Sequence, residues 1–95
     1  MAAADDVWFW TARDRESCYV TIHRYHRQAR GDYFAAFEAI AINHRGRPHW
    51  GKSHTRDAAY LQAAYLRFDD FVAVRERVDP QRRFDNPYLR RVLGD

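Results

Sequence analysis

The spacing of apolar residues changes along the chain, from a period of two near the N-terminus to a helical period after residue 32. From Cys18 to Tyr25 the residues alternate, which is typical of a β-strand with two different faces. One face is small and apolar, with Cys18, Val20 and Ile22. The other is polar and aromatic, with Tyr19, Thr21, His23 and Tyr25. This second face suits either a ligand or open water.

A second strand is predicted over residues 5–10, Asp-Asp-Val-Trp-Phe-Trp, with a polar turn at residues 13–17 joining it to the first. A ribbon of only two strands is marginal in water, and its edges are left unpaired. We therefore expect these strands to join a sheet from another polypeptide, or the chain to be part of something larger.

The rest of the chain is predicted to be helical. Three stretches repeat apolar residues at helical spacing: residues 33–41, 58–78 and 88–93. Asp32, Thr55 and Asn86 are the predicted N-caps, and Gly46 and Pro80 are expected to stop the helices before them. The predicted fold class is α+β, with two antiparallel strands followed by three to four helices.

The loop of residues 47–54, Arg-Pro-His-Trp-Gly-Lys-Ser-His, carries more polar and aromatic chemistry than a plain linker needs. Pro48 fixes its own φ, and Gly51 allows the backbone to approach another surface closely. Lys52 then projects a mobile cation from a rigid turn. The loop is interpreted as one that presents a charge to a ligand, although an isolated lysine is more often a solvated surface residue.

Composition limits the alternatives. The 95 residues suffice for one domain, and 46% hydrophobic residues supply a core. The net charge is +3, but arginines and acids are interspersed, which disfavours a nucleic-acid binder. No signal peptide or apolar run of about 20 residues is recognised, so a cytoplasmic location is expected. A single cysteine, Cys18, excludes an intrachain disulfide and is expected to be an inert core thiol on the apolar strand face.

Four stretches carry a family resemblance: residues 3–8, 15–23 and 47–52, and a tail over residues 79–94 containing Asp-Pro and Phe-x-Asn-x-Tyr-Leu. In this order and spacing they resemble the C-terminal part of the D-arabinono-lactone oxidase family. These FAD enzymes of the vanillyl-alcohol-oxidase type are grouped with L-gulonolactone oxidase, alditol oxidase and xylitol oxidase. The resemblance implies that residues 1–95 are the C-terminal part of a substrate (cap) domain.

The family's FAD-binding domain is absent from this chain, and so is a Glu-x-Arg pair that normally precedes residue 3. The implied activity is that of an FAD-dependent oxidoreductase, which oxidises an aldono-1,4-lactone or an alditol by hydride transfer to flavin. The implied partners are a sugar lactone or polyol and an FAD-binding domain, in cis or in trans. The isolated chain is expected to be inactive. Membrane association is implied by some family members only.

The resemblance also implies site residues. Lys52 is the expected catalytic and cofactor-binding cation, which would stabilise the anionic reduced flavin or hold a substrate oxygen. His23 is the second catalytic candidate, able to hydrogen-bond the substrate hydroxyl or take its proton. Tyr25, which aligns with a substrate-contacting threonine, and His49 are assigned to substrate binding. Trp50 is expected to be structural.

Three alternatives stay open. The chain could instead be a catalytically inactive truncated remnant of such an enzyme, or an interaction module. The third alternative, a small basic nucleic-acid binder, is the least favoured. A metal site is also disfavoured. His44, His49 and His54 are evenly spaced, but no Cys–His pattern or helical i,i+4 pair accompanies them.

Overall fold

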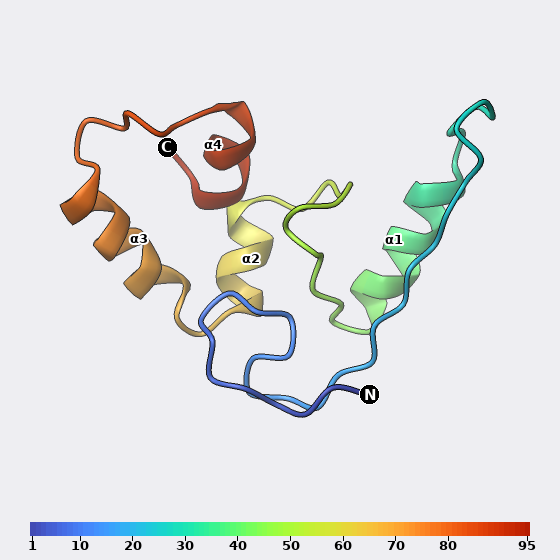
Figure 1. Ribbon diagram of the computed structural model, residues 1–95, viewed down its shortest axis with the longest axis horizontal. Helices are drawn as coiled ribbons and strands as arrows, with labels where there is room; N and C mark the ends of the chain where they lie inside the picture. Colours follow the sequence, from blue (N-terminus) through green and yellow to red (C-terminus); the bar gives the residue numbers. More distant parts are fainter.

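Four helices and long connecting segments make up the structure, a computed structural model that describes residues 1–95 (Figure 1). The helices are α1 (Tyr33–Asn43), α2 (Ala58–Ala64), α3 (Phe68–Val78) and α4 (Pro87–Leu93). All four lie within the stretches where helical spacing predicts a helix, although the break between α2 and α3 was not predicted. None is long and apolar enough to cross a membrane.

Local sequence accounts for the ends of these helices. Asn86 caps α4, since its side chain accepts a hydrogen bond of 2.9 Å from the N–H of Leu89. The N-cap of α2 is Asp57, which accepts a bond of 3.0 Å from the N–H of Tyr60. The prediction of Thr55 as this cap was therefore wrong. Its backbone N–H instead donates to the Glu38 carboxylate on α1 at 3.0 Å.

The C-terminal end of α1 explains why glycine stands at residue 46. Arg45 has a left-handed φ of 56°, and its N–H donates to the carbonyl oxygen of Ile42 at 2.9 Å. The N–H of Gly46 reaches back to the Ala41 oxygen at 2.7 Å, which completes a Schellman motif. A Cβ at Gly46 would lie only 2.7 Å from that same oxygen. The predicted stop at Gly46 thus has a steric cause.

The predicted pair of antiparallel strands is wrong, and with it the α+β class, because the structure contains no sheet. Only two isolated bridges occur, Ala2 with Ser17 and Asp5 with Arg13. Residues 7–13 form tight turns, with the N–H of Trp10 donating to the Val7 oxygen at 3.2 Å. A period of two describes side chains, whereas a strand also needs a neighbouring backbone to bond. No segment of these 95 residues provides one for residues 18–24.

The expected burial of Cys18 was wrong for the same reason. Its thiol is exposed, as is Val20 on the same face. Without a sheet to hold it against the core, the segment after residue 17 leaves the N-terminal turns and runs toward α1 (Figure 1).

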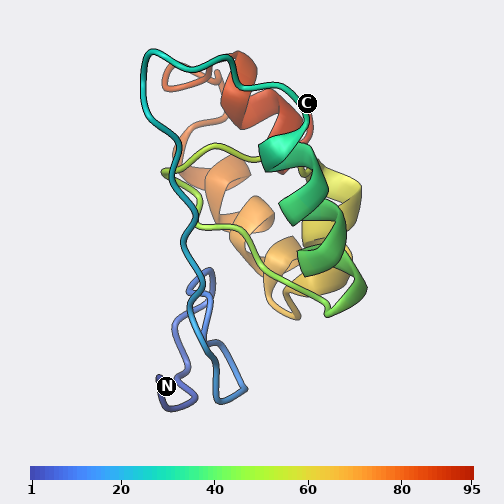
Figure 2. The same cartoon turned by 90° about the vertical axis from the view of Figure 1, so that its right-hand side faces the viewer.

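The core is small and lies where α2 meets α3 and α4. Its buried residues are Leu61, Tyr65, Phe68, Val92 and Leu93, and Phe9 and Trp50 pack against them. By contrast, α1 has no buried residue. The molecule is elongated, 42 × 31 × 19 Å, with α3 and α1 toward the two ends of its long axis (Figure 1). Across that axis, the N-terminal turns and α4 lie on opposite sides (Figure 2).

Candidate functional site

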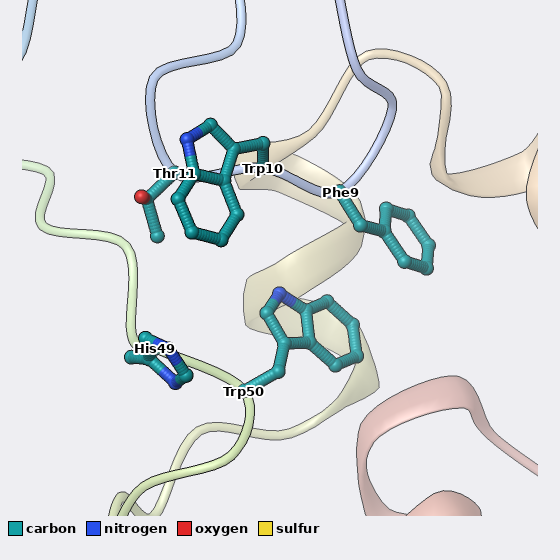
Figure 3. A pocket seen from close by; sticks show the side chains of 5 residues that line it. All are labelled: Phe9, Trp10, Thr11, His49 and Trp50. Atoms are coloured by element: carbon teal, nitrogen blue, oxygen red, sulfur yellow. The ribbon is translucent and has the colours of Figure 1, made fainter. Parts of the chain in front are cut away.

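A pocket of about 300 Å³ opens where the N-terminal turns face the loop of residues 47–54 (Figure 3). It is lined by Phe9, Trp10, Thr11, His49 and Trp50. The two lining segments, residues 9–11 and 49–50, are far apart in the sequence, so the pocket exists only in the folded molecule. We refer to it as the aromatic pocket.

Packing against the core fixes the inner wall of the aromatic pocket. The ring of Trp50 stacks on Phe9, with 4.7 Å between centroids and 12° between planes. Its indole N–H donates to the hydroxyl of Tyr65 at 3.3 Å. Phe9 in turn lies 4.3 Å from the ring of Phe71 on α3. Because these rings are held on several sides, this wall is rigid.

The outer wall is more polar and more open. Trp10 is 45% exposed and meets the imidazole of His49 edge-on, with 6.3 Å between ring centroids. The Nδ1 atom of His49 accepts the N–H of Gly51 at 3.1 Å, which leaves Nε2 as the protonated nitrogen. A Cβ at Gly51 would lie 3.3 Å from the His49 ring, so glycine permits this close turn. The surface that faces the pocket is nevertheless almost entirely apolar, because the polar atoms of the lining residues point elsewhere.

Arg47 joins the two halves of the pocket. Its Nε donates to the Ala64 oxygen at 3.1 Å, and one terminal nitrogen donates to the oxygens of Thr11 at 3.2 Å and Arg13 at 2.7 Å. The guanidinium also lies over the Tyr65 ring, 4.7 Å from its centroid. Burial lowers the pKa of Arg47, and the nearby charge of Arg15 lowers it further. Nothing in the sequence marks Arg47 for this role, because carbonyl partners leave no sequence signal.

His54 supports the loop from behind. Its Nδ1 accepts the N–H of Arg56 at 3.1 Å, so the proton is on Nε2, which lies 3.1 Å from the Tyr88 hydroxyl. Tyr88 then donates to the Trp50 carbonyl oxygen. Burial lowers the pKa of His54, and the charge of Arg91 lowers it further. A neutral His54 is thus one link in a hydrogen-bond chain that ends at the pocket wall.

The predicted site residues are not all in one place. His49 lines the aromatic pocket. Lys52 is exposed. Its backbone N–H donates to the backbone oxygen of His49 at 2.9 Å, so the two residues lie in one tight turn. His23 and Tyr25 are exposed on the extended segment, and Tyr25 lies against the ring of His26 at 4.6 Å. The aromatic pocket contains none of Lys52, His23 and Tyr25, so their roles stay predictions.

The arrangement suits a small ring better than an ion. Its volume is at the low end of the range for small-molecule sites, about 300–1,000 Å³, and such sites combine apolar walls with a few polar groups. A ring of that size could lie with its C–H faces against the indoles of Trp10 and Trp50. No three His, Cys, Asp or Glu side chains come together to hold a metal ion.

Comparison with known proteins finds a family and relatives that are named for sugar lactones. The family model described as D-arabinono-1,4-lactone oxidase matches residues 1–92. The chain is 47% identical over 93 residues to the L-gulono-1,4-lactone dehydrogenase of Mycobacterium tuberculosis (strain ATCC 25618 / H37Rv), covering 98% of this chain and 22% of that protein. It is 36% identical over 93 residues to the L-gulonolactone oxidase of Bos taurus, covering 94% and 21%.

A shorter match, 49% identical over 47 residues, is to an alditol oxidase of Streptomyces sp. (strain IKD472 / FERM P-14339), covering 50% of this chain and 11% of that protein. The chain corresponds to the C-terminal part of its relatives. It spans about a fifth of the length of the first curated relatives it matches. No solved structure matches the chain.

Proposed function

The chain belongs to the D-arabinono-1,4-lactone oxidase family, and from that premise we propose that it is the C-terminal segment of an FAD-dependent oxidoreductase acting on an aldono-1,4-lactone or an alditol. The observation that carries this proposal is the aromatic pocket, because it lies within the matched residues 1–92 and is built partly by the loop that contains Lys52. Names of relatives that act on sugar lactones support the same substrate class.

We propose that the aromatic pocket binds the sugar ring. A lactone or polyol presents C–H faces that would pack on the Trp10 and Trp50 indoles, and its hydroxyls would point out of the pocket. The rigid wall at Trp50 would hold the ring in one orientation, and the open wall at Trp10 would let it enter. Positioning of this kind lowers a barrier by removing orientational freedom before reaction.

The family implies FAD, and the residues present fit part of that cofactor. The chain contains no glycine-rich turn for a pyrophosphate, so the phosphates would be held outside these residues. Lys52 fits the flavin ring end, since its side chain is exposed and forms no ion pair. When bound, FAD supplies a hydride acceptor for the carbinol carbon. Lys52 would provide positive charge there, and His23 would take the hydroxyl proton.

A chimera provides the test of this proposal. This chain replaces the matching 93 residues of the Mycobacterium tuberculosis relative, and the product is purified with bound FAD. Adding L-gulono-1,4-lactone, D-arabinono-1,4-lactone or an alditol without oxygen should bleach the flavin absorbance with at least one of them. A flavin-loaded chimera that none of these compounds bleaches would disprove the proposed activity.

The role of Lys52 is tested in the same chimera. Lys52→Met keeps the length of the side chain but removes its charge, and we expect flavin reduction to slow by about 100-fold or more, the usual cost of losing one transition-state donor. Arg77→Met is the matched control, because Arg77 is exposed on α3 and makes no hydrogen bond or ion pair. Equal rates for both variants would exclude Lys52 from the site.

A non-catalytic interaction module is the second candidate. It is favoured by one observation, the absence of any buried residue in α1. Such a module would fold in the chimera and bind no lactone. The bleaching assay therefore separates the two functions.

A further inference from the structure

A second pocket, about 530 Å³ in volume, opens between α2 and the C-terminal end of α1. It shares no lining residue with the aromatic pocket. Three of its seven lining residues are arginines and none is acidic, so we refer to it as the arginine pocket. The seven are Arg15, Ile42, Arg45, Arg47, Tyr60, Ala63 and Ala64. Like charges gathered in one pocket repel one another, and a bound anion would relieve that repulsion.

The positive charge of the arginine pocket is largely unused by the chain. Arg15 and Arg45 form no ion pair, and their side chains make no hydrogen bond. Arg47 bonds carbonyl oxygens through Nε and Nη1, which leaves Nη2 without a partner. Burial lowers the pKa of Arg47 and the charge of Arg15 lowers it further, so these two guanidinium groups are close enough to repel.

Helix ends do not explain this cluster. Arginines are common at the C-terminal ends of helices, where they bond free carbonyl groups. That reason applies to Arg47, whose Nε donates to the Ala64 oxygen at the end of α2. It does not apply to Arg15 and Arg45, because the last oxygens of α1 accept from the backbone N–H groups of the Schellman motif instead. Two guanidinium groups therefore line the pocket without a structural partner.

The remaining walls of the arginine pocket are apolar and fixed in place. Ile42 comes from α1, and Ala63 and Ala64 come from α2. The Tyr60 hydroxyl donates to the Gly46 oxygen at 2.7 Å, which holds α2 against the turn that ends α1. An inorganic anion would leave these walls uncovered, whereas an anionic group attached to carbon atoms would cover them.

We propose that the arginine pocket binds the phosphate group of a small phosphate ester, with the carbon atoms of the ester against Ile42 and Ala63. The planar fork of a guanidinium matches two phosphate oxygens at once. A phosphate monoester carries about 1.5 to 2 negative charges at pH 7, more than a carboxylate or a diester, and so suits three cations best. This inference goes beyond the proposed function and does not rest on it, because neither flavin nor lactone takes part.

NMR titration of the 95-residue chain with butyl phosphate tests the inference. The Nε–H signal of Arg47 should shift and saturate with a Kd of about 1 mM, as expected for a few partly exposed contacts. Inorganic phosphate should bind at least about 3-fold more weakly, because it lacks the carbon atoms that cover the apolar walls. Sodium chloride at the same ionic strength should give no saturable shift. Equal Kd values for the two phosphates, or the same shifts with chloride, would overturn the proposal.

Charge-removing variants locate the site. Arg15→Gln and Arg45→Gln each remove a side chain that bonds nothing, so both variants should keep the fold. Each should weaken the binding of butyl phosphate by at least about 5-fold, the effect of losing one charge contact near the surface. Arg77→Gln is the matched control, because Arg77 is exposed on α3 and outside the pocket, and its Kd should stay within about 2-fold of the parent value. Equal Kd values for all three variants would contradict the assignment.

The chimera shows whether the arginine pocket stays open beside the rest of a complete protein. Calorimetry should detect butyl phosphate binding, and Arg15→Gln should weaken it by the same factor as in the free chain. Absence of this Arg15-dependent binding would overturn the proposal, because another part of the polypeptide would then occupy the pocket.

These measurements need no turnover, so the two proposals fail separately. A chimera that oxidises a lactone without binding butyl phosphate would overturn only the phosphate site. A chimera that binds butyl phosphate but is bleached by no lactone or alditol would overturn only the proposed activity.

Discussion

Replacing Arg47 by methionine removes the hydrogen bonds that join the pocket loop to the N-terminal turns and to the end of α2. The variant keeps most of the aliphatic packing and loses three hydrogen bonds, to the oxygens of Ala64, Thr11 and Arg13. Thr11 is buried, so water cannot easily replace the lost donor there. The cation–π contact with Tyr65 is lost as well.

The expected loss follows from these contacts. A hydrogen bond from a charged donor contributes about 1.5–3 kcal/mol, and contributions that share one side chain do not add. With water recovering part of the bonding at half-buried Arg13 and Ala64, we expect Arg47→Met to lower the free energy of unfolding by about 3 kcal/mol. A domain of this size has about 5–10 kcal/mol in total, so the variant should still fold.

Urea denaturation followed by tryptophan fluorescence measures this loss, with an unchanged m-value showing that the unfolded states are comparable. Arg77→Met is the surface control and should stay within about 0.5 kcal/mol of the parent protein. Arg47→Lys should lie between the two, because an ammonium keeps the charge but lacks the fork that reaches several carbonyls. A loss below about 1 kcal/mol for Arg47→Met would refute the role of Arg47 as a clamp.

Two further predictions concern the supports of the loop. Gly46→Ala should lower the free energy of unfolding by about 1–3 kcal/mol, because the added Cβ would collide with the Ala41 oxygen. Gly31→Ala meets no neighbour, so it should cost only the roughly 1 kcal/mol of a left-handed φ. Equal melting temperatures of the two variants would argue against the collision. Burial lowers the pKa of His54 in the folded chain below its ordinary 6.5, so the unfolded chain binds a proton more readily. The stability that depends on neutral His54 is therefore complete above pH 6.5. It is lost as the pH falls toward the pKa of the folded state. His54→Gln should flatten the decline in stability from about pH 7 to about pH 5, and an unchanged slope would show that His54 is not responsible.

Sequence patterns located the helices well because the signals for a helix are local. Asn86 and Pro87 start α4 within their own turn, and Gly46 ends α1 through a contact with Ala41, five residues earlier. The alternation from Cys18 to Tyr25 was equally clear, but a strand depends on a neighbour that can be far away in sequence or in another polypeptide. The predicted sheet failed at that step.

The candidate site was predictable only in part. Motif resemblance drew attention to His49 and its loop, and His49 does line the aromatic pocket. On the opposite wall, Phe9 and Trp10 were predicted to lie in a strand, because the turns that expose Trp10 depend on tertiary contacts. Arg47 was missed because its partners are backbone oxygens, which every residue has.

The most direct test of the account is whether a lactone contacts the aromatic pocket. The free chain contains all residues that line it, and the indole N–H signals of Trp8, Trp10 and Trp50 can be followed by NMR as L-gulono-1,4-lactone is added. The signals of Trp10 and Trp50 should shift with a Kd of about 1–10 mM, typical of a small ligand held by few contacts. Trp8, which lies outside the pocket under Arg67, should not move. Unchanged Trp10 and Trp50 signals, or an equal shift of Trp8, would contradict the account.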